Sequence, residues 1–141
     1  MTGAASSAEL RARIRNQAGN RCGYCQSHQD YLPWTLEIEH IIPLAKGGSD
    51  EEANLWMACH TCNLHKGVKT RASDPLTGRD IRLFNPRRQQ WSRHFNWSAD
   101  GTQIIGRTAC GRATVVALNL NNLLAVTVKR NWVSAGWHPP R

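Results

Sequence analysis

The sequence lacks the long apolar run that a membrane-spanning helix requires. No stretch of its 141 residues approaches the roughly 18 apolar residues that cross a bilayer. The N-terminus, MTGAASSAELRARIR, has no charged segment followed by an apolar one, so we expect no secretory signal peptide. These absences argue against a membrane partner. They predict a cytoplasmic protein whose thiols stay reduced.

Internal repeats and low-complexity stretches are also missing. Hydrophobic residues make up 40% of the chain and include six tryptophans, which favours a globular protein over a disordered one. The length suits one domain, or a compact catalytic module with an extension.

Acidic residues are scarce, with ten against eighteen lysines and arginines and a formal net charge of +8. This imbalance favours a polyanionic partner. The charges are also unevenly distributed. Residues 30–52 carry six acids and one base, whereas residues 66–94 carry eight bases and two acids. The pattern is typical of a metal site beside a phosphate-binding surface, and its alternative is solvated charge on two loops.

Four of the five cysteines form two Cys-x-x-Cys pairs, 33 residues apart: Cys22, Cys25, Cys59 and Cys62. Two such knuckles complete a tetrahedral site for structural Zn²⁺. A disulfide framework and a redox-active pair are the alternatives, and the cytosolic setting and the doubled spacing disfavour them. Zinc would contribute on the order of 10 kcal/mol to folding. Cys110 lies outside the pattern, and we expect it to be a small buried residue.

Local signals outline the elements around these knuckles. Ser6 and Glu9 match a capping box for a first helix that Gly19 ends. Alternation predicts a strand over residues 35–40, followed by a loop and then a short apolar return over 54–58. We expect a further helix from Cys62 to about Lys69.

A boundary is expected after Asp74, followed by a mostly helical extension. Residues 79–84 should be extended, and residues 103–105 a short strand. Two helices should close the chain, the first starting near Thr108 or Gly111 and the second near Asn121 or Asn122.

The segment between and including the knuckles carries an ordered set of further residues. It contains Glu39-His40-Ile-Ile-Pro, Gly47-Gly48, Asn54-Leu55 and Cys59-His-Thr-Cys62-Asn63-Leu-His-Lys66. In this order the residues resemble the zinc-knuckle branch of the HNH endonucleases. That resemblance implies a ββα-metal, treble-clef-like module that grips one divalent ion. Residues 75–141 resemble an extension found in small stand-alone bacterial members.

The resemblance also implies roles for individual residues. His40 would be the general base, an assignment that its near-neutral intrinsic pKa suits, and Asn54 would orient the loop that bears it. Glu39 and Asn63 match the positions of ligands for Mg²⁺ or Mn²⁺, or another divalent transition metal. His65 is the alternative to Asn63. Residues two apart on a helix point about 200° apart, so the two side chains cannot easily face the same ion. The family usually has Asp where this chain has Glu39.

Basic side chains supply candidate contacts to DNA phosphates. They are Lys66, Lys69, Arg71, Arg87, Arg88 and Arg93. Trp91, Phe95 and Trp97 interleave with some of them. We expect these aromatic side chains to pack in a core, with base stacking as the alternative.

These observations predict an α+β protein with an N-terminal helix and an HNH nuclease module over residues 1–74, and an extension over 75–141 that packs on it. The expected function is metal-dependent hydrolysis of DNA phosphodiester bonds. A non-catalytic zinc module that binds nucleic acid is the main alternative, and a zinc-stabilised protein-interaction domain is a weaker one. The sequence leaves open specificity, a monomer or a homodimer, and nicking or double-strand cleavage.

Overall fold

The computed structural model describes residues 7–140 and has a mixed α+β fold made of two compact units. Unit 1 comprises Met1–Thr70 and Asn85–Gln89, and unit 2 comprises Arg71–Phe84 and Gln90–Arg141. Among the described residues, unit 1 contains α1 (Ala8–Gln17), β1 (Glu37–His40), β2 (Leu55–Ala58), α2 (His60–Lys66) and short 3-10 turns at Gln29–Tyr31, Leu44–Lys46 and Glu52–Asn54. Unit 2 contains β3 (Arg71–Ser73), β4 (Asp80–Arg82), α3 (Trp91–His94), β5 (Phe95–Trp97), β6 (Ile104–Gly106), α4 (Ala109–Ala117) and α5 (Leu123–Ser134).

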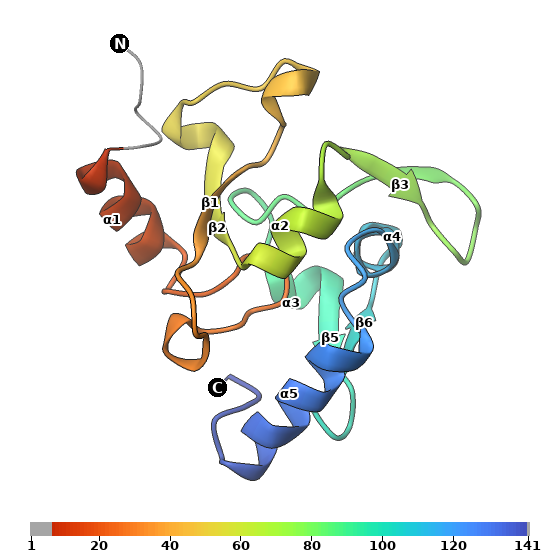
Figure 1. The fold of residues 1–141 in the computed structure, drawn as a ribbon. Coiled ribbons are helices and arrows are strands. Elements are labelled where there is room, and N and C mark those ends of the chain that lie inside the picture. The colour runs from red at the N-terminus through yellow and green to blue at the C-terminus, as the bar shows by residue number, and fades with distance from the viewer. Residues whose placement is uncertain (1–6, 141) are drawn as a thin grey trace. The chain divides into compact units, whose positions relative to one another are not determined.

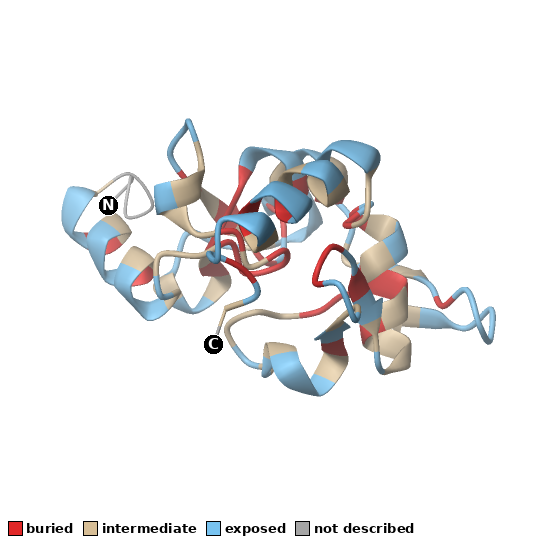
Figure 2. Ribbon diagram, turned by 90° about the horizontal axis from the view of Figure 1, so that it is seen from below, coloured by how far each residue is buried: buried red, intermediate tan, exposed pale blue. Residues whose placement is uncertain are grey.

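The centre of unit 1 is an antiparallel pair, β1 and β2, in which His40 lies opposite Leu55 (Figure 1). Helix α2 follows β2 directly and packs on β1, while α1 packs on β2. Leu10 and Ile14 are the buried residues of α1, and Figure 2 shows the rest of this helix turned toward solvent. A strand–strand–helix unit therefore holds the stretch of chain that bears both cysteine pairs.

Helix α1 begins one residue later than a Ser6 cap would place it. The hydroxyl of Ser7 accepts a hydrogen bond from the Leu10 N–H at 3.0 Å and so caps the helix. Ser6 lies outside the described residues. Helix α2 begins at His60, two residues earlier than expected, because Cys59 is its N-cap.

Unit 2 contains two hairpins, β3–β4 and β5–β6, beside its helices, so it is not the mostly helical extension that the sequence predicts. The expected start sites of the last two helices are confirmed, with Thr108 and Asn122 as the capping residues. Helix α4 packs on both hairpins. Its Thr114 hydroxyl accepts a hydrogen bond from the Phe84 N–H at 2.9 Å.

The aromatic side chains of unit 2 pack against one another, as expected. The rings of Trp91 and Phe95 stack with centroids 5.1 Å apart, and the rings of Trp91 and Trp97 lie 4.9 Å apart. Phe84 meets Phe95 edge to face. No described helix combines the length and the apolar character needed to cross a membrane.

An ion pair inside unit 2 predicts a measurable pH dependence. The carboxylate of the fully buried Asp74 accepts two hydrogen bonds from Arg112, both at 2.9 Å, and these lower its pKa well below the ordinary range. Stability from a lowered carboxyl pKa is complete above the unfolded value of about 3.9 and is lost as the pH falls below it. Asp74→Asn should therefore lower the melting temperature at pH 7. The difference from wild type should shrink as the pH drops below about 4, and a pH-independent difference would contradict this account.

Candidate functional site

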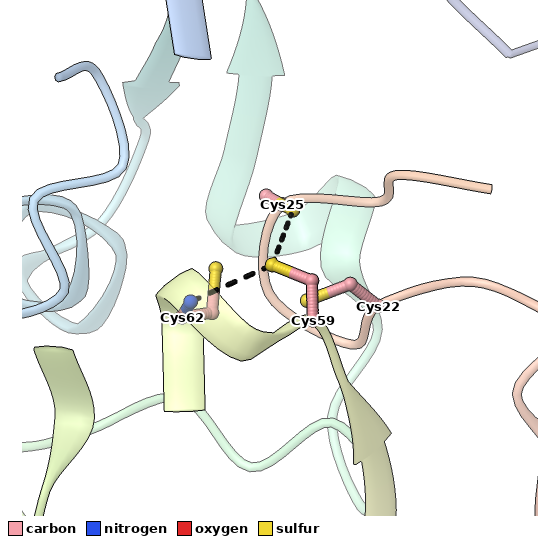
Figure 3. A group of neighbouring side chains, drawn as sticks. All are labelled: Cys22, Cys25, Cys59 and Cys62. Carbon is pink, nitrogen blue, oxygen red and sulfur yellow. Dashed lines mark hydrogen bonds between the residues drawn. The ribbon is translucent and has the colours of Figure 1, made fainter. Parts of the chain in front are cut away.

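The four paired cysteines converge at one buried point of unit 1, as Figure 3 shows. Cys22 and Cys25 lie on the loop after α1, Cys59 is the N-cap residue between β2 and α2, and Cys62 lies in the first turn of α2. Their sulfur atoms all lie within 4.8 Å of one another, and none forms a disulfide. The four thiols are therefore positioned for a single metal ion.

The donor set suits a tetrahedral metal. Zn–S bonds of about 2.3 Å place sulfur atoms roughly 3.8 Å apart in a tetrahedron, and the Cys25 and Cys59 sulfurs are 3.7 Å apart. Burial raises the pKa of the Cys22 thiol well above its ordinary value. A bound cation would offset that penalty, because it stabilises the thiolate form.

A second buried cluster joins the first knuckle, β1 and α2. The Lys66 ammonium lies 2.7 Å from one Glu39 oxygen, and both side chains are 2% exposed. The other Glu39 oxygen accepts a hydrogen bond from the Tyr24 hydroxyl at 2.7 Å. Lys66 also donates to the carbonyls of His40, at 3.1 Å, and Ile41, at 2.9 Å. Three acceptors thus surround the three N–H bonds of the ammonium.

This cluster corrects two expectations from the sequence. The Lys66 ammonium is enclosed by protein acceptors, so it is not presented to a DNA phosphate. Both oxygens of Glu39 are engaged by Lys66 and Tyr24. Burial raises the pKa of the Glu39 carboxyl, against the opposing effect of the Lys66 charge.

Asn63 meets a different carboxylate. Its amide donates to Glu37 at 2.9 Å, and the His60 ring lies 2.8 Å from the other Glu37 oxygen. Partial burial tends to raise the pKa of Glu37, but the hydrogen bonds from Asn63 and His60 lower it overall. Glu39 and Asn63 therefore do not form a ready ligand pair for a divalent ion. His65 is outside this cluster, and its Nδ1 has no hydrogen-bond partner among the described residues.

His40 is the last residue of β1 and directly precedes the loop that leads to β2. Its Nε2 is 2.7 Å from an Asp50 oxygen, and the His40 side chain is 25% exposed. The sequence does not predict this contact. The Asp50 carboxylate falls ten residues after His40, on a loop whose path no local pattern specifies.

Asn54 fixes both arms of that loop. Its side-chain oxygen accepts from the Ile42 N–H at 2.9 Å, and its side-chain N–H groups donate to the carbonyls of Ile42, at 2.9 Å, and Ser49, at 2.8 Å. Gly48 is required here, because a Cβ would lie 1.7 Å from the Ile42 carbonyl oxygen. The Asn54 side chain therefore ties the Ile42 backbone to the Ser49 backbone.

The remaining basic candidates are distributed over both units. Arg87 is anchored within unit 1: it donates to the Leu55 carbonyl at 3.1 Å and to Gln17 at 2.8 Å, and its guanidinium lies over the Trp56 ring. Its side chain therefore fastens segment 85–89 to the rest of unit 1. The other four are exposed: Lys69, Arg71, Arg88 and Arg93.

Comparison with protein families gives a match that covers the site. Residues 22–69 match the family model described as HNH endonuclease. The matched segment contains the four cysteines, His40, Asn54 and Asn63, so the similarity to this family covers both cysteine pairs and the loop at the end of β1. No curated protein and no solved structure matches the chain.

Proposed function

We propose that this protein is a DNA endonuclease whose HNH domain hydrolyses phosphodiester bonds with His40 as general base. The observation that carries the proposal is the arrangement of His40 within that domain. Its ring is partly exposed, held by Asp50, and placed at the end of a strand whose following loop is fixed by Asn54. A mobile surface histidine would have none of these constraints.

In the proposed reaction, an imidazole nitrogen of His40 accepts a proton from a water molecule as the water oxygen attacks phosphorus. The bond from phosphorus to the leaving oxygen then breaks, and that oxygen keeps the electron pair and takes up a proton from solvent. A neutral imidazole suits this task because its ordinary pKa lies close to physiological pH. Two exposed basic residues of unit 1, Lys69 and Arg88, would contact neighbouring phosphates.

We also propose that the four cysteines hold structural Zn²⁺ in a ββα-metal module. Their sulfur spacing and the closed set of four thiols support this assignment. Such an ion has no open position for substrate, so its contribution is to fasten the loop after α1 to the start of α2. Residues near the knuckles, including Tyr24 and Lys66, then keep fixed positions around β1.

A requirement for Mg²⁺ or Mn²⁺ stays a prediction from the family resemblance. The expected ligands Glu39 and Asn63 are each engaged by other side chains, so we assign no step of the reaction to such an ion. The engagement of Glu39 and Asn63 by other side chains favours one alternative function, a zinc-containing module that binds nucleic acid without cutting it.

His40→Ala should abolish most of the cleavage of supercoiled plasmid, because general-base catalysis supplies about 10²- to 10⁴-fold in rate. Cleavage should be followed on gels with Mg²⁺, with Mn²⁺ and with neither ion. His60→Ala is the matched control, since His60 is an exposed histidine of the same domain. Cleavage that survives in His40→Ala would refute the assignment. DNA retardation by wild type with no cleavage under any condition would support the alternative.

A further inference from the structure

The contact between His40 and Asp50 specifies which nitrogen of the ring is available for proton transfer. An ionised carboxylate can only accept a hydrogen bond, so the Asp50 oxygen at 2.7 Å requires a proton on His40 Nε2. In a neutral imidazole the other nitrogen, Nδ1, then carries the free lone pair. No described residue hydrogen-bonds to Nδ1.

The position of Asp50 is built into the loop rather than set by its side chain alone. Asn54 binds the Ser49 carbonyl next to Asp50 and both backbone groups of Ile42, two residues after His40. The Gly48 N–H also donates to the Pro43 carbonyl at 3.0 Å. The two arms of the loop are therefore tied together on each side of the pair, and the carboxylate is held beside the ring.

The backbone of His40 is held from the other side by Lys66, which donates to the carbonyls of His40 and Ile41. Because the backbone is already held at both residues, less conformational entropy is lost when the pair forms. A partly exposed carboxylate that orients a histidine would also stabilise the imidazolium that forms when the ring takes a proton.

We propose that Asp50 is a positioning residue for the reaction, and that it holds His40 in the Nε2–H form so that Nδ1 accepts the proton from water. This inference rests on the proposed function. In the step itself, one O–H bond of water breaks, an N–H bond forms at Nδ1, and the water oxygen uses its electron pair to bond to phosphorus. Asp50 keeps its hydrogen bond to Nε2 throughout and does not take the proton.

The kinetic test compares Asp50→Ala and Asp50→Asn with Glu51→Ala, a control that removes the neighbouring exposed carboxylate. Loss of the hydrogen-bond partner that orients a histidine costs about 10- to 100-fold at metal sites. We expect Asp50→Ala to lower kcat by about the same factor, with little change in KM. Asp50→Asn keeps an oxygen acceptor and should lose less. In a His40→Ala background, Asp50→Ala should cause no further loss, because the two residues act as one unit.

A spectroscopic test separates this inference from the proposed function. In the wild-type protein, the ¹⁵N chemical shifts of the neutral His40 ring should show a protonated Nε2 and an unprotonated Nδ1. Asp50→Ala should change those shifts, and Glu51→Ala should not. If wild type cleaves no DNA, the proposed function fails, and unchanged shifts in Asp50→Ala would overturn the positioning role separately. Equal kcat for wild type and Asp50→Ala, or additive losses with His40→Ala, would also overturn it.

Discussion

Removing the metal, or replacing Cys59 with alanine, is expected to unfold unit 1. Four thiols packed within 4.8 Å of one another are buried in a unit whose two strands have four residues each. Structural zinc contributes on the order of 10 kcal/mol in small metal-dependent domains, which is comparable to the whole stability of many domains. The four-cysteine site should therefore be the largest single contribution to the fold of unit 1.

The measurement is circular dichroism and zinc content before and after treatment with a strong chelator, for wild type, Cys59→Ala and Cys110→Ala. Cys110 is the matched control because it belongs to unit 2 and is not a member of the four-cysteine cluster. Wild type and Cys110→Ala should each bind about one Zn²⁺ per chain, the number that a four-thiolate site holds. Chelated protein that keeps its full helical signal would show that the knuckles do not hold the fold.

Replacing Lys66 with methionine is expected to have the second largest effect on stability. The substitution leaves the Glu39 carboxylate buried with Tyr24 as its remaining partner, and it frees the carbonyls of His40 and Ile41. Breaking a buried ion pair by removing one partner costs about 3–5 kcal/mol. The loss should appear as a lower midpoint in urea denaturation of the zinc-loaded protein.

Lys69→Met provides the comparison, because Lys69 is exposed three residues farther along the chain. The double variant Glu39→Gln, Lys66→Met removes the unpaired charge, so it should recover part of the lost stability. If Lys66→Met loses no more stability than Lys69→Met, the ammonium is not the interior support that we describe.

Elements with strong local signals could be predicted from the sequence. Thr108 and Asn122 stand where a side-chain oxygen can cap a helix, and both α4 and α5 begin directly after them. The alternating residues before His40 gave the strand β1. The paired cysteines could be assigned to one cluster because their spacing directly expresses the geometry of a tetrahedral site.

The partners of polar side chains could not be predicted in the same way. From the sequence, Lys66 is expected to contact a phosphate and Glu39 to bind a metal ion. In the structure the two side chains form an ion pair inside unit 1. Asp50 reaches His40 only because the Asn54 hydrogen bonds close the loop between them. These outcomes depend on contacts between residues ten or more positions apart, which residue type and local spacing do not encode.

The return of residues 85–89 to unit 1 was missed for a related reason. The sequence predicts a single boundary near residue 74. In the structure, residues 71–84 belong to unit 2, and the chain then returns to unit 1 over residues 85–89. Arg87 provides the attachment through Leu55, Gln17 and the face of Trp56. A basic residue in a basic stretch gives no local sign that its role is to join segments of the chain.

The central claim is that the metal bound by the knuckles supports the fold and that His40 cuts DNA. The most direct measurement determines zinc content and plasmid cleavage on the same preparations of wild type and His40→Ala. We predict equal zinc content in the two proteins, with cleavage by wild type and at least about 100-fold slower cleavage by the variant. Equal cleavage by both zinc-loaded proteins would contradict the claim.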